Sequence, residues 1–207
     1  MSSYVYYLHM LQQEMHSVVF ATINEQGRPV TCAIDLMLAD ENGLYFLTAK
    51  GKSFYTRLNI TPFVSVTGIK GEDTMSSQSI SLHGQVREIG KQRLHEIFAQ
   101  NPYMAKIYPD EKSRSVLTVF QLYQGVGEFF DLSVQPIFRE VFSFGGEVLP
   151  QSGYFVQENC IGCKLCYSVC PQHCIDLVTV PVTIEQEHCL KCGRCLEICP
   201  KQAIEKR

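Results

Sequence analysis

The sequence predicts a mainly β antiparallel barrel with peripheral helices, followed by a small α+β module. Three observations support this fold class. Apolar stretches separated by turn residues run from about residue 17 to 144, a cysteine pattern occurs twice after residue 159, and a Gly- and Pro-containing stretch separates the two regions. The 207 residues suffice for one domain of ordinary size and one small domain. We therefore place the first domain at residues 1–145, a linker at 146–153 and the second domain at 154–207.

The first domain is read mostly as strands joined by turns. Two β-branched runs, 17–23 and 30–38, flank the turn residues 24–29, and Asn42-Gly43 is typical of a hairpin. Further strands are predicted at 44–48, 63–67, 79–89, 116–123, 125–132 and 137–144. Helices are predicted at 4–15, 51–59, 90–100 and 103–108. This succession favours a barrel whose ends are covered by helices.

Eight of the ten cysteines follow one spacing, C-x2-C-x2-C-x3-C-P, in two copies that begin at Cys160 and Cys189. This spacing binds [4Fe–4S] clusters in bacterial two-cluster proteins, where the fourth cysteine of each copy binds the other cluster. The first cluster is therefore assigned to Cys160, Cys163, Cys166 and Cys199, and the second to Cys189, Cys192, Cys195 and Cys170. Residues 154–207 resemble a bacterial two-[4Fe–4S] ferredoxin along their whole length.

Other uses of these cysteines fit the pattern less well. Disulfides require an oxidising compartment, and structural zinc sites use cysteine pairs separated by longer loops. Of the two remaining cysteines, Cys174 aligns with Ala203 in the other copy. We interpret Cys174 as a small buried residue, with a spare cluster ligand as the alternative.

The first domain carries an ordered series of further motifs. They are Phe20-Ala-Thr-Ile-Asn-Glu-Gln-Gly-Arg-Pro29, Asn42-Gly-Leu-Tyr-Phe-Leu-Thr48, Lys50-Gly-Lys-Ser53 and Pro62. In this order they resemble the pyridoxamine 5′-phosphate oxidase-like family of FMN-binding split barrels, over roughly residues 15–145. The resemblance implies a mainly β split barrel, bound FMN, and a homodimer with flavin sites between the subunits.

The segment between the third strand and the following helix suits a phosphate group. A helix N-terminus binds phosphate through its free amides and its dipole, and glycine permits a close backbone approach. Alone, the same segment could be a solvated loop with a serine N-cap. The residues that the resemblance favours for FMN are Thr48, Lys50, Gly51, Lys52 and Ser53, together with Cys32 on the second strand.

Two details qualify this flavin site. Phe54 stands where many relatives carry a phosphate-binding lysine, so Lys50 or Lys52 must take over that role. Cys32 is interpreted as a core residue of the flavin wall, with a redox-active thiol as the alternative.

The two halves together predict a flavin and iron–sulfur redox protein. It would relay electrons between two [4Fe–4S] clusters and FMN and reduce a small-molecule acceptor, with a reductase or a ferredoxin as redox partner. The alternative is a non-catalytic electron carrier or redox sensor whose barrel serves as a dimer platform. Pyridoxamine phosphate oxidase activity itself fits poorly, because that reaction passes electrons to oxygen and needs no clusters.

Charge and hydropathy exclude other classes of protein. The formal net charge is −3 and no basic tract is present, which argues against a nucleic-acid partner. No apolar run approaches the length of a membrane span, and the N-terminal residues lack the features of a signal peptide. Together with reduced cysteines, this predicts a cytoplasmic protein of a cell that lives under low oxygen, without a membrane partner.

Overall fold

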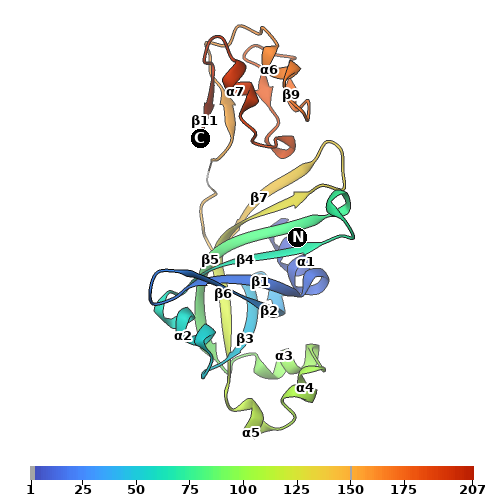
Figure 1. Ribbon diagram of the computed structural model, residues 1–207. Helices are drawn as coiled ribbons and strands as arrows, with labels where there is room; N and C mark the ends of the chain where they lie inside the picture. Colours follow the sequence, from blue (N-terminus) through green and yellow to red (C-terminus); the bar gives the residue numbers. More distant parts are fainter. Residues whose placement is uncertain (1–2, 150) are drawn as a thin grey trace. The chain divides into compact units, whose positions relative to one another are not determined.

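The computed structural model describes residues 3–149 and 151–207 (Figure 1). The chain forms two compact units. The first comprises the residues up to Lys70 together with Ser79–Phe129 and Val141–Val148, and the second comprises Gly71–Gln78, Phe130–Glu140 and Leu149–Arg207. Pro150 of the predicted linker lies outside the described residues, as do Met1 and Ser2 of the predicted first domain.

A seven-stranded antiparallel sheet forms the centre of the first unit, although end residues of three of its strands (78, 130–131 and 138–140) belong to the second unit. Its strands are β1 (Ser17–Ile23), β2 (Pro29–Asp40), β3 (Gly43–Ala49), β4 (Phe63–Lys70), β5 (Gln78–Gly90), β6 (Leu117–Asp131) and β7 (Phe138–Phe144). They are ordered β3-β2-β1-β4-β5-β6-β7, and an additional pairing of β3 with β6 closes six of them into a barrel. The predicted mainly β split barrel is therefore confirmed, with β7 as an extra strand.

Short helices accompany the strands of the sheet. They are α1 (Ser3–Met10), the π-helix η1 (Leu11–Met15), α2 (Ser53–Ile60), the 3-10 helix η2 (Thr74–Ser76), α3 (Leu94–Gln100), α4 (Met104–Ile107) and α5 (Glu111–Arg114). Helix α5, a single turn, was not predicted from the sequence. The side chain of Asp110 begins α5 by accepting a hydrogen bond from the backbone N–H of Ser113, in a reciprocal capping box.

Aromatic rings fill the barrel interior. Phe20, Phe46 and Phe120 are fully buried, and the ring centroid of Phe46 lies 4.7 Å from that of Phe20 and 5.8 Å from that of Phe120. Phe54 of α2 adds a fourth buried ring, 5.9 Å from Phe46. Helix α2 is therefore anchored by an apolar side chain at the position where the family pattern has a lysine.

Strand β6 is continuous, which corrects the prediction of separate strands at 116–123 and 125–132. Gly125 stands inside the strand, not at a break. A Cβ atom on Gly84 would lie 2.0 Å from the carbonyl oxygen of Gln124, and one on Gly125 would lie 2.5 Å from that of His83. These glycines therefore permit a close approach of β5 and β6.

The small α+β module of the second unit is built from two similar halves. Its elements are β8 (Tyr154–Val156), α6 (Leu165–Ser168), β9 (Ile175–Asp176), β10 (Thr183–Ile184), the 3-10 helix η3 (Gln186–His188), α7 (Arg194–Ile198) and β11 (Ile204–Lys206). Strand β8 pairs with β11, and β9 pairs with β10. Each half thus contributes one strand to each two-stranded sheet, as the sequence repeat predicts.

The backbone repeats as closely as the sequence does. Three pairs of residues 29 positions apart have left-handed φ angles. They are Gly162 and Lys191 at 65° and 55°, Lys164 and Gly193 at 65° and 80°, and His173 and Gln202 at 50° and 49°. The two cysteine loops therefore follow the same path. Among the described residues, no helix is both long and apolar enough to cross a membrane.

Candidate functional site

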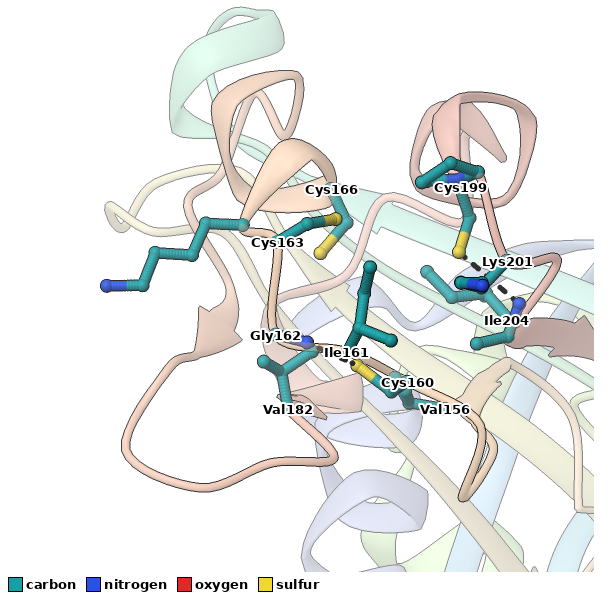
Figure 2. Close-up of a pocket in the computed structure, with 13 residues that line it drawn as sticks. Val156, Cys160, Ile161, Gly162, Cys163, Cys166, Val182, Cys199, Lys201 and Ile204 are labelled. Carbon is teal, nitrogen blue, oxygen red and sulfur yellow. Dashed lines mark hydrogen bonds between the residues drawn. The ribbon is translucent and has the colours of Figure 1, made fainter.

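The first group of cysteines surrounds an apolar cavity of the second unit (Figure 2). The cavity is lined by Cys160, Cys163, Cys166 and Cys199, with Val156, Val182 and Ile204 among the apolar wall residues. Cys160 and Cys163 come from the first loop, and Cys166 lies on α6. Cys199 follows α7 and so belongs to the other half of the module. The sulfur atoms face a common space.

A second cavity gathers the remaining cysteines of the repeat. Cys170, Cys189, Cys192 and Cys195 line it, and Cys174 lines it as well. Cys170 follows α6 and therefore again comes from the opposite half. The Sγ atoms of Cys170 and Cys174 lie 3.5 Å apart. All ten cysteines lie in the described part of the chain and carry free thiols.

Backbone amides point at the sulfur atoms in both cavities. The N–H of Gly162 donates to Sγ of Cys160 at 3.5 Å, and that of Lys191 donates to Sγ of Cys189 at 3.3 Å. Gly162 and Lys191 are equivalent in the repeat, and each has a left-handed φ. Hydrogen bonds of this kind favour the thiolate form of cysteine.

The residues of both cavities fit cubane clusters. Each cavity has four thiols in the required spacing, apolar walls and amide donors to sulfur, which are the features that [4Fe–4S] sites use. The assignment of particular cysteines to particular clusters stays a prediction.

The hairpin between β6 and β7 contacts the second cysteine loop within the second unit. The backbone N–H of Ile137 donates to Oε1 of Gln172 at 3.0 Å, and the carbonyl oxygen of Ile137 lies 2.8 Å from Nδ1 of His188. Nη1 of Arg139 donates to the carbonyl oxygen of Cys189 at 3.0 Å. These three hydrogen bonds, each between a side chain and a backbone group, attach the hairpin to residues at the second cavity.

In the first unit, the predicted phosphate segment joins β3 to α2. Thr48 is buried at the end of β3, and its Oγ1 has no hydrogen-bond partner among the residues that the structure describes. Lys50, Gly51 and Lys52 form the turn, and α2 begins at Ser53, two residues later than predicted. No described side chain caps the N-terminus of α2. An orphaned hydroxyl, an uncapped helix start and two lysines fit a phosphate group.

Cys32 lies on β2 opposite Phe20. Burial raises the pKa of the Cys32 thiol, although the positive charges of Arg57 and Lys52 oppose this rise. Arg57 on α2 donates from Nε to Oγ1 of Thr22 at 2.7 Å. Arg57 was not among the residues predicted for the flavin site. A cation one helical turn after Ser53 was the available signal, since residues four apart share a helix face.

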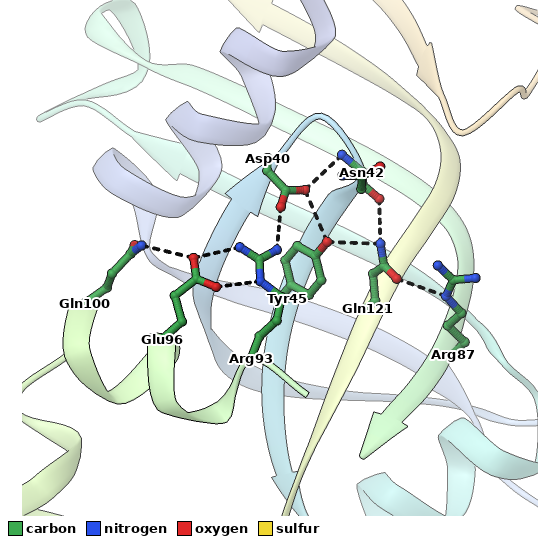
Figure 3. Close-up of polar contacts among 8 residues, drawn as sticks. All are labelled: Asp40, Asn42, Tyr45, Arg87, Arg93, Glu96, Gln100 and Gln121. Carbon is green, nitrogen blue, oxygen red and sulfur yellow. Dashed lines mark hydrogen bonds and ion pairs between the residues drawn. The ribbon is translucent and has the colours of Figure 1, made fainter. Parts of the chain in front are cut away.

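A separate polar network surrounds an open groove of the first unit (Figure 3). The guanidinium of Arg93 stacks 4.2 Å from the ring centroid of Tyr45 and pairs with both Asp40 and Glu96. These partners raise the pKa of Arg93, the hydrogen bond to Glu96 most strongly.

The same network continues across the sheet. Oη of Tyr45 donates to Asp40 at 3.2 Å, and the side-chain amide of Gln121 donates to Oη of Tyr45 at 3.2 Å. Because the charge of Arg93 is matched by two carboxylates, we interpret the network as a brace that ties α3 to β2, β3 and β6.

Family models match both regions of the chain. A model described as "Pyridoxamine 5'-phosphate oxidase" matches residues 9–123, which is more than half of the chain, and a model described as "4Fe-4S dicluster domain" matches residues 159–203. Both predicted resemblances are confirmed. No curated protein matches the chain in sequence.

Three bacterial proteins are among the solved structures that match the chain. A NimC/NimA family protein from Clostridium acetobutylicum has 20% identity and a TM-score of 0.56, covering 68% of this chain and 92% of that one. ChuZ from Campylobacter jejuni has 14% identity and a TM-score of 0.50, covering 63% and 56%. A pyridoxamine 5'-phosphate oxidase-related, FMN binding protein from Nostoc punctiforme has 12% identity and a TM-score of 0.46, covering 72% and 94%. The first two show a shared fold.

Proposed function

We propose a redox function for this chain, which belongs to the pyridoxamine 5'-phosphate oxidase family and carries a 4Fe–4S dicluster domain C-terminal to its barrel. In this proposal the protein binds two [4Fe–4S] clusters and one FMN, relays electrons between them and reduces a small-molecule acceptor. The observation that carries the proposal is the division of the repeat cysteines between two similar cavities.

The cluster half of the proposal rests on the geometry of the thiols. Cys160, Cys163, Cys166 and Cys199 would hold the first cluster, and Cys189, Cys192, Cys195 and Cys170 would hold the second. The amides of Gly162, Lys191 and Ala203 would donate to ligand sulfurs, the last to Cys199 at 3.3 Å. Such donors lower the cost of adding negative charge to a cluster.

The flavin half rests on the start of α2. The free amides at Ser53 and the side chains of Lys50, Lys52 and Arg57 would bind the phosphate, and Thr48 would gain a partner for its buried hydroxyl. Bound FMN supplies the exchange between single electrons and electron pairs. Cys32 would lie in the wall of the site as a neutral thiol, because its pKa is raised by burial.

A homodimer is part of the same proposal. The outer face of β1 and β4 exposes several apolar side chains, among them Val19, Phe63 and Ile69, with 49%, 39% and 67% of their surfaces accessible. Apolar groups in neighbouring strands favour burial against a partner surface. Light scattering coupled to size-exclusion chromatography would give twice the 23.5 kDa chain mass if this holds.

The experiment that tests the function is anaerobic purification followed by cofactor analysis and stopped-flow reduction. We expect about eight irons per chain, one FMN, and flavin bleaching that follows reduction of the clusters. Clusters without flavin would contradict the relay and support an electron carrier or a redox sensor. A Soret band in place of flavin absorbance would show that the bound cofactor is heme and not FMN. Bleaching of the flavin by pyridoxamine phosphate would instead support oxidase activity.

A further inference from the structure

The two cysteine cavities differ in whether a fifth cysteine lines them. Cys174 lines the second cavity, and Ala203 lines the first at the matching place in the repeat. Cys174 is 2% exposed and Ala203 is fully buried, so both side chains point inward. Because alanine fills this place in one half, packing alone does not require a thiol in the other half.

Cys174 lies close to the cluster ligands of its cavity. Its Sγ is 3.5 Å from Sγ of Cys170, within the range of a sulfur hydrogen bond, and its thiol also has the Cys189 thiol as a hydrogen-bond partner. Cys170, Cys189, Cys192 and Cys195 already supply one thiolate for each of the four irons of a cubane. A fifth cysteine therefore keeps its proton, and an S–H group is a hydrogen-bond donor, although a weak one.

We propose that the Cys174 thiol donates a hydrogen bond to a ligand thiolate of its cavity, that of Cys170 or of Cys189, and so raises the reduction potential of the second cluster. The physical reason is that one electron added to the cluster increases the negative charge on its sulfur atoms. A donor beside one of these sulfurs stabilises the reduced state more than the oxidised state. The step adds one electron, and the thiol proton stays on Cys174.

This inference rests on the proposed cluster assignment and gives Cys174 the role of a positioning residue. The first cluster has no equivalent thiol, because Ala203 offers only a methyl group. The Ala203 N–H donates to Sγ of Cys199 in its place. The structure therefore predicts that the two clusters differ in potential through a single side chain, in addition to any difference in their charged neighbours.

The test is an EPR-monitored redox titration of the anaerobically purified full-length protein and three variants. Cys174→Ala should keep the iron content of the wild type and shift only the second cluster to a more negative potential. Cys174→Ser keeps an O–H donor and should shift it less. Ala203→Cys adds a thiol to the other half and should shift the first cluster to a more positive potential.

Each outcome decides the proposal. Unchanged potentials in Cys174→Ala with full iron content would overturn it. Loss of the second cluster in both Cys174 variants would also overturn it, since Cys174 would then be a ligand. Failure of the proposed function is visible separately, because wild-type protein would then lack the iron of two clusters or the flavin before any variant is compared.

Discussion

The guanidinium of Arg139 donates a hydrogen bond from Nη1 to the carbonyl oxygen of Cys189, at a distance of 3.0 Å. Cys189 is the first cysteine of the second loop, so the contact places a permanent positive charge beside one cluster site. Arg139 also stacks with its Cζ 5.2 Å from the ring centroid of Phe130. A fixed cation at this place favours the more negative state of whatever occupies the site.

Replacing Arg139 by Gln should therefore lower the potential of the second cluster. A tenfold change in a one-electron equilibrium corresponds to about 59 mV, and we expect a shift on the order of that value. Arg207→Gln is the matched control, because Arg207 also stacks on a phenylalanine, while its side chain bonds to Glu205 and its backbone to Gly153 and neither bonds to a cysteine loop. EPR-monitored titration measures both. Equal shifts in the two variants would show that the effect is not local to Cys189.

Cys163 and Cys192 offer a matched pair of ligand variants, because both are exposed and equivalent in the repeat. Cys163→Ala should lose the first cluster preferentially and Cys192→Ala the second, leaving about four irons in each case. Cys32→Ala, in the first unit, should keep the full iron content. Iron analysis and EPR spectra distinguish these results. Full iron content in both ligand variants would contradict the assignment.

Arg57→Gln should weaken FMN binding. Arg57 lies one helical turn after Ser53. In the proposed site its guanidinium contributes one charge-assisted interaction to the phosphate, so we expect about tenfold weaker binding, or about 1.4 kcal/mol. Arg28→Gln removes the same charge from an exposed turn and should leave the affinity unchanged. Fluorescence titration of flavin into apoprotein measures the dissociation constants. Equal losses of flavin affinity in the two variants would show that the effect comes from net charge and not from a contact of Arg57 with the phosphate.

Arg93→Met should destabilise the first unit, because it leaves Asp40 and Glu96 without their cation. These groups are only partly buried, so we expect a loss of about 1 kcal/mol in the free energy of unfolding. Lys91→Met changes an exposed lysine two residues earlier and serves as the control. Denaturant unfolding followed by tyrosine fluorescence gives the comparison, since the chain has no tryptophan. An unchanged midpoint in Arg93→Met would contradict the brace.

Tyr103 provides a prediction at alkaline pH. Burial, together with the hydrogen bond that Oη donates to Asp35 at 3.1 Å, raises the pKa of Tyr103 to about 12. The folded state thus favours the protonated phenol, so its stabilisation is complete below about pH 10, the ordinary tyrosine pKa. That contribution is lost as the pH rises from about 10 through 12.

NMR of Cζ-labelled tyrosine should show Tyr103 titrating well above the ordinary tyrosine pKa of about 10. Asp35→Asn should lower its pKa, because it removes the negative acceptor while the partial burial remains. A wild-type Tyr103 that titrates at about 10 would contradict the environment described for it.

The barrel could be predicted because its strands alternate and its turns carry Asn, Gly and Pro at the required places. The cysteine loops were predictable for a different reason, since the repeat constrains spacing and backbone together. What the sequence did not show depends on contacts between distant segments. The close approach at Gly84 and Gly125 makes one long strand of two predicted ones, and no local pattern indicates it.

The flavin site was less predictable than the cluster sites. In the sequence, Phe54 departs from the family pattern for no visible reason. In the structure its ring packs against those of Phe20 and Phe46 in the barrel core. Arg57 lies one turn further along, and only the packing of α2 against the barrel brings it near Cys32. A side chain chosen by tertiary packing leaves little trace in a single sequence.

The exchange of the fourth cysteine between the halves has an evolutionary consequence. Cys170 lies in the cavity of the second loop and Cys199 in that of the first. A chain with only one copy of the cysteine motif would therefore supply three thiols to one cluster site, and its fourth thiol would reach the site of a different chain. Such a half-length ancestor would have had to pair with an identical chain to complete either site. Duplication and fusion of the gene would then have turned an association between molecules into a permanent covalent one.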